Sequence, residues 1–227
     1  MCFVRHGTTP TTGKVLPGRA KGLHLAEKGR FEAEQAGERL AALSRVTAVY
    51  SSPLERARET AVAVARALGQ PVQIERGLLE CDFGEWTGGE LAALRRLPAW
   101  DAVLRNPSGF RFPSGESFAE LRARVAATVE RIVARHPGEV VVAVSHADPI
   151  KVAVGDALGA PLDLLQRTTV SPCSVSIVAY GPSGPKVLTV NSTGELASLG
   201  IDPVGEGAPA RAGARAGTRA RAGVPAR

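Results

Sequence analysis

The sequence lacks any long apolar run. No stretch of its 227 residues approaches the roughly 18 consecutive apolar residues of a membrane-spanning helix. The opening MCFVRHG also lacks the order of a secretory signal, in which a basic region precedes an apolar one. Cysteine is scarce: Cys2, Cys81 and Cys173 are odd in number and far apart, which excludes a disulfide framework and the usual metal-site spacings. We therefore expect a cytoplasmic protein that does not contact membranes.

A strong excess of positive charge is missing from most of the chain. The formal net charge is +6, but residues 203–227 hold five arginines and one glutamate, which leaves +2 for residues 1–202. This terminal segment is almost entirely Ala, Gly, Arg and Pro, so we predict a disordered tail after one domain at 1–202. We expect no specific nucleic-acid partner. Weak binding of the tail to anionic polymers is the alternative.

Within residues 1–202, short apolar stretches alternate with amphipathic ones. We expect strands at 2–4, 48–50, 139–144, 175–180 and 187–190, and helices at 27–43, 53–68, 116–135 and from 148 onward. The run at 139–144 is apolar throughout, as in a strand covered on both faces. This order predicts an α/β fold, a three-layer α/β/α sandwich with a mostly parallel central sheet. The first strand is so short that a chain start upstream of Met1 stays an open alternative.

Two local patterns make finer predictions about the first two helices. At 27–43, apolar residues recur at approximate helical spacing and predict one buried face, made of Phe31, Ala33, Ala36, Leu40 and Leu43. In the next helix, Ser52 and Glu55 stand three residues apart and Pro53 follows the serine. That pattern is typical of a capping box with proline at the first helical position.

Polar and cationic residues follow three of the predicted strands. Arg5 and His6 follow the first strand, Arg56 lies one turn into the helix after the second, and His146 follows the most apolar strand. Open α/β sheets bind ligands at the carboxyl ends of their strands, so these four side chains should converge at one edge. A cluster of two arginines and two histidines suits a phosphoryl group better than a neutral ligand.

Four sequence blocks carry a family resemblance. They are RHG at 5–7, SSPLERARET at 51–60, LECDFGEWTG at 79–88 and VSH at 144–146. In this order they resemble the histidine phosphatase superfamily, the phosphoglycerate mutase-like group, over residues 2–195. The resemblance implies the phosphoglycerate mutase-like fold and a metal-independent phosphomonoester hydrolase that acts through a phosphohistidine on a small phosphorylated metabolite. It implies no cofactor and no metal ion. A phosphomutase of the phosphoglycerate mutase type is the alternative.

The same resemblance implies a role for each matching residue. His6 is the expected nucleophile, and Glu80 is the expected general acid and base. A purely structural Glu80 stays open, because Asp82 and Glu85 are close in the sequence. Thr12 stands where many members carry an asparagine that binds phosphate, so this contact departs from the pattern. The expected phosphoryl ligands are Arg5, Thr12, Arg56, His146 and the amide of Ala147.

The segment at 89–115 bears on the choice between phosphatase and mutase. We interpret it as the lid of the substrate pocket, where members with mutase activity carry a longer and more basic insertion. Here it is compact and leads into FPSGESF at 112–118, which resembles the phosphatase branch. The mutase alternative stays open because this segment carries Arg95, Arg96, Arg105 and Arg111.

Overall fold

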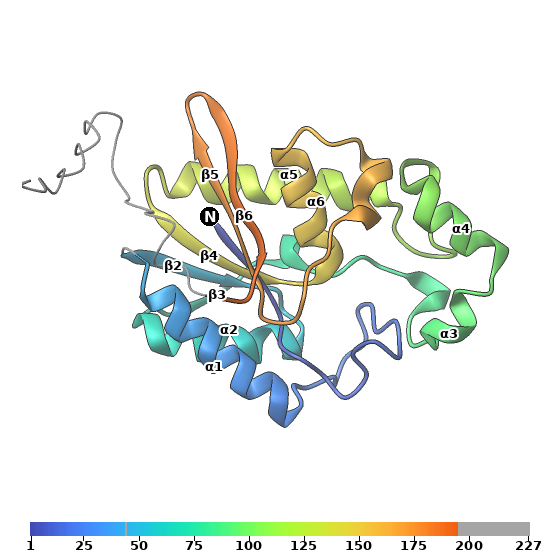
Figure 1. Ribbon diagram of the computed structural model, residues 1–227, viewed down its shortest axis with the longest axis horizontal. Helices are drawn as coiled ribbons and strands as arrows, with labels where there is room; N and C mark the ends of the chain where they lie inside the picture. Colours follow the sequence, from blue (N-terminus) through green and yellow to red (C-terminus); the bar gives the residue numbers. More distant parts are fainter. Residues whose placement is uncertain (44, 195–227) are drawn as a thin grey trace, which may run out of the picture.

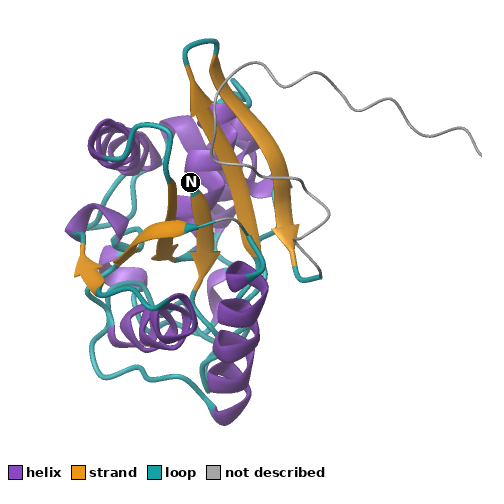
Figure 2. Ribbon diagram, turned by 90° about the vertical axis from the view of Figure 1, so that its left-hand side faces the viewer, coloured by secondary structure: helices purple, strands orange, loops and turns teal. Residues whose placement is uncertain are grey.

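In the computed structural model, which describes residues 1–43 and 45–194, helices cover both faces of a six-stranded sheet (Figures 1 and 2). The strands are β1 (Cys2–Arg5), β2 (Val46–Ser51), β3 (Val72–Ile74), β4 (Val140–Ser145), β5 (Val175–Gly181) and β6 (Gly184–Ser192). The α-helices are α1 (Glu27–Ala41), α2 (Glu55–Leu68), α3 (Leu91–Leu94), α4 (Pro98–Arg105), α5 (Phe118–Arg135) and α6 (Ala147–Ala157). Short 3-10 helices span Arg76–Leu78, Gly84–Trp86, Pro107–Gly109 and Leu162–Arg167.

The sheet order is β3-β2-β4-β1-β5-β6. The first four of these strands are mutually parallel, whereas β5 is antiparallel to β1 and β6 is antiparallel to β5. The predicted three-layer α/β fold with a mostly parallel sheet is therefore confirmed. Within the described residues, no helix combines the length and the apolar character that crossing a membrane requires. The predicted tail at 203–227 lies outside the described residues.

Strand β4 is buried along its whole length because both of its faces are covered. Val142 belongs to the apolar core formed with α1 and α2, and its neighbour Ala143 belongs to the core formed with α5 and α6. Side chains alternate in the same way along β1, where Val4 and Phe3 enter opposite cores. The continuous apolar run at 139–144 thus follows from two cores that share one strand.

The predicted apolar face of the first helix is wrong at Phe31, which is 59% exposed. The buried residues of α1 are mostly small: Gly29, Ala33, Ala36, Gly37 and Leu40. Small residues are needed because α1 lies directly against other backbone. A Cβ atom on Gly29 would come within 2.0 Å of the Thr8 carbonyl oxygen, so the helix packs through its backbone and leaves the phenylalanine outside.

The predicted capping box at Ser52 is also wrong. Helix α2 begins at Glu55, its N-cap is Leu54, and no side chain caps it. The Ser52 hydroxyl oxygen lies 2.8 Å from Nε2 of His146 instead. A serine that fits a helix-capping pattern is thereby used to hold a histidine at the end of the neighbouring strand.

Strand register sets the geometry of the sheet edge. Arg5 of β1 pairs with Ser145 of β4, and Ser51 of β2 pairs with Val144. Just beyond these pairs, the His6 amide donates to the Ser145 carbonyl at 3.0 Å. The three strands therefore end at nearly the same level, which places their following residues together.

Candidate active site

His6 follows β1 directly and is 4% exposed. Its Nδ1 lies 2.8 Å from the Gly7 carbonyl oxygen. A carbonyl can only accept, so Nδ1 carries the proton and Nε2 is left with a lone pair. The Nε–H of Arg56 donates to this Nε2 at 3.3 Å. The local backbone therefore selects the tautomer in which Nε2 is the nucleophilic atom.

The surroundings of His6 keep its imidazole neutral. Burial lowers its pKa well below the ordinary value of 6.5, and the positive charges of Arg56 and Arg5 lower it further. The hydrogen bond to Gly7 acts in the opposite direction but is the smallest of these influences. A neutral imidazole, with an unprotonated ring nitrogen, is the form that attacks an electrophile.

The backbone around His6 is tightly fixed. The Gly7 amide donates to the Thr60 hydroxyl at 3.0 Å, and that hydroxyl donates to the Arg56 carbonyl at 2.8 Å. Gly7 also lies so close to α1 that a Cβ there would come within 2.4 Å of the Gly29 carbonyl oxygen. Helix α2 therefore positions both Arg56 and the peptide that follows the histidine.

The guanidinium group of Arg56 is buried, that of Arg5 is partly buried, and both are only partly hydrogen-bonded. Arg56 is fully buried, and its Nη2 donates to the Gly18 carbonyl at 2.7 Å. Arg5 donates from Nη1 to the Val170 carbonyl at 2.6 Å. Burial is the main influence on both groups and lowers the pKa of each. Among the described residues, Nη1 of Arg56 and Nε of Arg5 are buried without a hydrogen-bond partner.

His146 directly follows the apolar strand β4 and is the N-cap residue of α6. Its ring centroid lies 5.2 Å from that of His6. Burial lowers its pKa well below 6.5, and the positive charges of Arg56 and Arg5 add to that shift. Nε2 contacts the Ser52 hydroxyl, whereas Nδ1 is buried with no partner in the described part of the chain.

Glu80 supplies a buried carboxyl group to the same cluster. One of its oxygens accepts from the Cys81 amide at 3.0 Å. Burial, together with the nearby charge of Asp148, raises the pKa of Glu80 to about 7, although the Cys81 amide, Arg56 and Arg5 act in the opposite direction. A carboxyl group with a pKa near neutrality can both give and take a proton at physiological pH.

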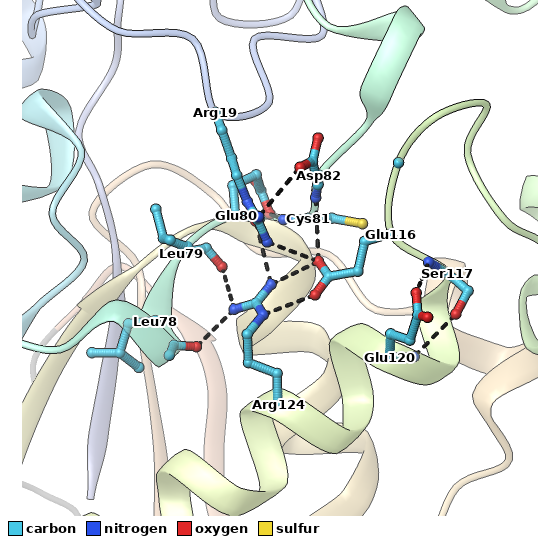
Figure 3. Close-up of polar contacts among 12 residues, drawn as sticks. Arg19, Leu78, Leu79, Glu80, Cys81, Asp82, Glu116, Ser117, Glu120 and Arg124 are labelled. Carbon is cyan, nitrogen blue, oxygen red and sulfur yellow. Dashed lines mark hydrogen bonds and ion pairs between the residues drawn. The ribbon is translucent and has the colours of Figure 1, made fainter.

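The main chain at Glu80 is held by a polar network shown in Figure 3. Both Arg19 and Arg124 donate to the Glu80 carbonyl oxygen, at 2.9 and 3.3 Å. Both also pair with the carboxylate of Glu116, at 3.1 and 2.8 Å. We call Arg19, Glu116 and Arg124 the Glu80 clamp. Sequence reasoning did not identify it, because Arg19 and the Glu80 main chain are both distant in sequence from Glu116 and Arg124.

The structure brings together five of the predicted residues, namely Arg5, His6, Arg56, Glu80 and His146. Ala147, also predicted, is the first residue of α6, so its amide lies at a helix N-terminus, where amides lack intrahelical partners. Thr12 has another contact: its hydroxyl accepts from the Thr9 amide at 2.8 Å within the same loop. Its role in substrate binding stays a prediction.

Three contacts around the cluster were missed from the sequence. The sequence predicts a helix cap for Ser52, a possible pairing with Arg56 for Thr60 and only a helix start for Asp148. The sequence signal for Ser52 and Thr60 was their position inside the SSPLERARET block. In the described residues, no group of three or more His, Cys, Asp or Glu side chains is arranged to hold a metal ion.

Comparison with known proteins gives a family match over most of the chain. The family model described as "Histidine phosphatase superfamily (branch 1)" matches residues 1–193. The Mycobacterium tuberculosis "Bifunctional protein Rv2228c" is 35% identical over 204 residues, which cover 86% of this chain and 54% of that protein. The chain therefore spans about half the length of this relative.

A second relative and a solved structure match along nearly their whole length. The Salmonella choleraesuis protein named "Probable phosphoglycerate mutase GpmB" is 31% identical, with 80% of this chain and 85% of that protein covered. The structure of Bacillus stearothermophilus YhfR superposes with a TM-score of 0.77 at 29% identity and covers 87% of this chain and 98% of that one.

Proposed function

The chain belongs to the histidine phosphatase superfamily, branch 1, and from this premise we propose that it hydrolyses phosphomonoesters through a phosphohistidine intermediate. The substrate class is a small phosphorylated metabolite. Nucleophilic catalysis by an imidazole divides one difficult displacement at phosphorus into two easier ones. The reacting groups are supplied by side chains alone in this proposal, so activity should not depend on an added metal ion.

In the first step, the lone pair on Nε2 of His6 attacks phosphorus while the bond to the ester oxygen breaks. Glu80 gives its proton to that leaving oxygen, which departs as an alcohol. In the second step, a water oxygen attacks phosphorus and gives a proton to Glu80. The bond between phosphorus and nitrogen breaks, and its electron pair returns to Nε2. Inorganic phosphate leaves, and both residues are restored to their starting protonation states.

The observation that carries the proposal is a set of three buried nitrogen atoms, two on guanidinium groups and one on an imidazole, without partners among the described residues. These are Nε of Arg5, Nη1 of Arg56 and Nδ1 of His146. Leaving a buried donor unpaired is unfavourable by about 1–3 kcal/mol, and by more for a charged group. The three residues lie close together, since the charge of Arg5 affects the pKa of Arg56 and both charges affect the pKa of His146. A phosphoryl group has several anionic oxygens that would satisfy them at once.

Fixed cations also suit the chemistry of phosphoryl transfer, which depends mainly on positioning and on stabilising charge. Arg5 and Arg56 stay protonated even when burial lowers their pKa. Their charges serve two purposes here. They attract the dianionic ester, and they keep His6 neutral so that it can attack.

The test is the hydrolysis of 4-nitrophenyl phosphate in the presence of a chelator, with wild type beside His6→Ala. We expect chelator-resistant hydrolysis that the substitution abolishes, and acid-labile phosphate on the quenched wild-type protein. Equal rates for the two proteins would overturn the nucleophile assignment. A loss of activity in chelator that added metal restores would overturn the metal-independent chemistry.

A phosphomutase is the second candidate, because one relative is named as a phosphoglycerate mutase. Two of the four arginines that favour this alternative are engaged elsewhere: Arg105 pairs with Asp101 and Arg111 pairs with Glu120. These pairings favour hydrolysis, since a mutase needs free cations for a second phosphate. Incubation with a phosphoglycerate separates the two, because a hydrolase releases inorganic phosphate and a mutase yields the isomer.

A further inference from the structure

Glu80 lies in a stretch of chain that has almost no regular structure of its own. The 3-10 helix Arg76–Leu78 ends just before it, and the next one begins at Gly84. Neither a sheet ladder nor a helix therefore fixes the backbone of Glu80. The carbonyl groups of this stretch need other donors, and these come from side chains.

Arg124 supplies most of them from α5. Its Nη1 donates to the carbonyl oxygens of Gly77 and Leu79, at 2.8 and 2.9 Å, and its Nη2 donates to that of Glu80 at 3.3 Å. Nε and Nη2 also donate to the two carboxylate oxygens of Glu116, at 2.9 and 2.8 Å. An arginine has five N–H groups, so every one is used. Lysine has three donors at a single point and cannot replace this pattern.

Glu116 joins the two arginines of the clamp to the same stretch of backbone. Its Oε2 accepts from Arg19, from Arg124 and from the Asp82 amide, the last at 3.2 Å. The Glu116 amide in turn donates to the Asp82 carbonyl at 2.8 Å. Figure 3 shows the clamp closing on the chain from both sides, with the Glu80 carbonyl at its centre.

The clamp acts on the position of Glu80 and leaves its carboxyl group free. The hydrogen bonds that the clamp makes to Glu80 end on its carbonyl oxygen. The carboxyl oxygen of Glu80 accepts from the Cys81 amide instead. The charged groups that most affect the Glu80 carboxyl are Asp148, Arg56 and Arg5. The side chain can therefore exchange a proton while its main chain stays in place.

We propose that Arg19, Glu116 and Arg124 are positioning residues that hold Glu80 in reach of the leaving oxygen. This inference rests on the proposed function, in which Glu80 protonates that oxygen. Misplacing a catalytic group by about 1 Å can reduce a rate by about 10²-fold. Disrupting the clamp should therefore slow the reaction most for esters whose leaving oxygen must be protonated by Glu80.

The test compares two esters of similar shape, phenyl phosphate and 4-nitrophenyl phosphate. Phenolate leaves poorly without a proton, whereas 4-nitrophenolate leaves readily. The measured quantity is kcat/KM, which reports on phosphoryl transfer to the enzyme and not on the later hydrolysis. We expect Arg124→Lys to lower it by about 10²-fold on phenyl phosphate and by only a few-fold on 4-nitrophenyl phosphate.

Glu80→Gln should show the same dependence on the leaving group. In the double variant Glu80→Gln/Arg124→Lys, the second substitution should cause little further loss, because the group it positions is gone. The matched control is Arg122→Lys, two residues away on the same helix, where the side chain is half-exposed and pairs with Asp156. This control should behave as wild type on both esters.

Equal losses on the two esters for Arg124→Lys would overturn the inference, because a general structural defect affects both reactions alike. If Arg124→Lys does not fold, Arg19→Lys at the more exposed side of the clamp decides by the same comparison. Wild-type protein without His6-dependent hydrolysis would overturn the proposed function itself. Equal losses in an enzyme that still depends on His6 would overturn the clamp alone.

Discussion

Replacing Glu80 by glutamine should steepen the dependence of stability on pH between about pH 5 and pH 6. Three buried groups have pKa values in the folded protein that differ from their ordinary values, and these differences affect stability in this pH range. His6 and His146 have folded-state pKa values well below 6.5, and Glu80 has one of about 7 against an ordinary 4.5. Between their folded and unfolded pKa values, such groups bind different numbers of protons in the two states.

The signs of the two effects are opposite. As the pH falls below about 6.5, each histidine gains a proton in the unfolded chain but not in the folded protein, so the free energy of unfolding falls. As the pH falls below about 7, the Glu80 carboxyl gains a proton in the folded protein before it does in the unfolded chain. That uptake raises the free energy of unfolding, and the effect is complete near the ordinary pKa of 4.5.

The net slope follows from this balance of protons. Two histidines add about two protons to the unfolded state, and Glu80 adds about one to the folded state. These three groups together should therefore make the stability of the wild type rise by about 1.4 kcal/mol per pH unit in this window. Without the carboxyl group, the slope for Glu80→Gln should be steeper than that of the wild type by about the same amount. The slope for His6→Gln should be shallower than that of the wild type by about 1.4 kcal/mol per pH unit, because one histidine then balances the carboxyl.

Urea unfolding at several pH values across the window measures these slopes. Because the three proteins share all their other titrating groups, the contributions of those groups cancel in the differences between the slopes. The glutamine at position 80 keeps the size and polarity of the side chain, so the change in slope reports on the proton alone. Parallel lines for wild type and Glu80→Gln would refute the reasoning, since Glu80 would then titrate alike in the folded and unfolded states.

Three further predictions concern the site and its support. Arg56→Met should lower kcat/KM by at least about 10²-fold, as loss of a transition-state donor does, and phosphate should no longer raise the melting temperature. Ser52→Ala removes the hydrogen-bond partner of His146 and should lower kcat/KM by about tenfold, with the urea midpoint as the check on folding. Gly29→Ala should destabilise the protein by about 1–3 kcal/mol in urea unfolding, because its Cβ would meet the Thr8 carbonyl.

Most of the sheet could be predicted because its strands carry their own signal. The apolar run at 139–144 identifies a doubly covered strand, and β4 spans Val140–Ser145 with every residue buried. Strand β3 gave no such signal. It is three residues long, has two exposed side chains and, within the described residues, pairs with β2 alone, so tertiary pairing decides its structure rather than local pattern.

Helix details were less predictable, because a pattern can be used for another purpose. Phe31 has the right spacing for the buried face of α1 but lies outside it, since Gly29 and Gly37 bring the helix backbone too close to its neighbours. Ser52 has the right spacing for a cap but lies within hydrogen-bonding distance of His146. In both cases a contact distant in sequence outweighs a local preference.

For the candidate site, the sequence predicts that His6 and His146 lie close together at the sheet edge, but it does not predict the residues that hold Glu80 in place. The position of His6 and His146 after parallel strands was enough to bring their side chains together. The clamp could not be found in this way. Arg124 lies in the middle of α5, and a sequence alone does not distinguish it from an arginine in solvent such as Arg122.

The place of β1 in the sheet has a consequence for folding. Strand β1 lies between β4 and β5, and Cys2 pairs with Val142 on one side and Ile177 on the other. During synthesis, the strand that carries the expected nucleophile emerges long before either neighbour exists. Such distant pairing slows folding. A nascent or truncated chain that ends before β4 also lacks His146, which follows that strand, so it cannot assemble the candidate site.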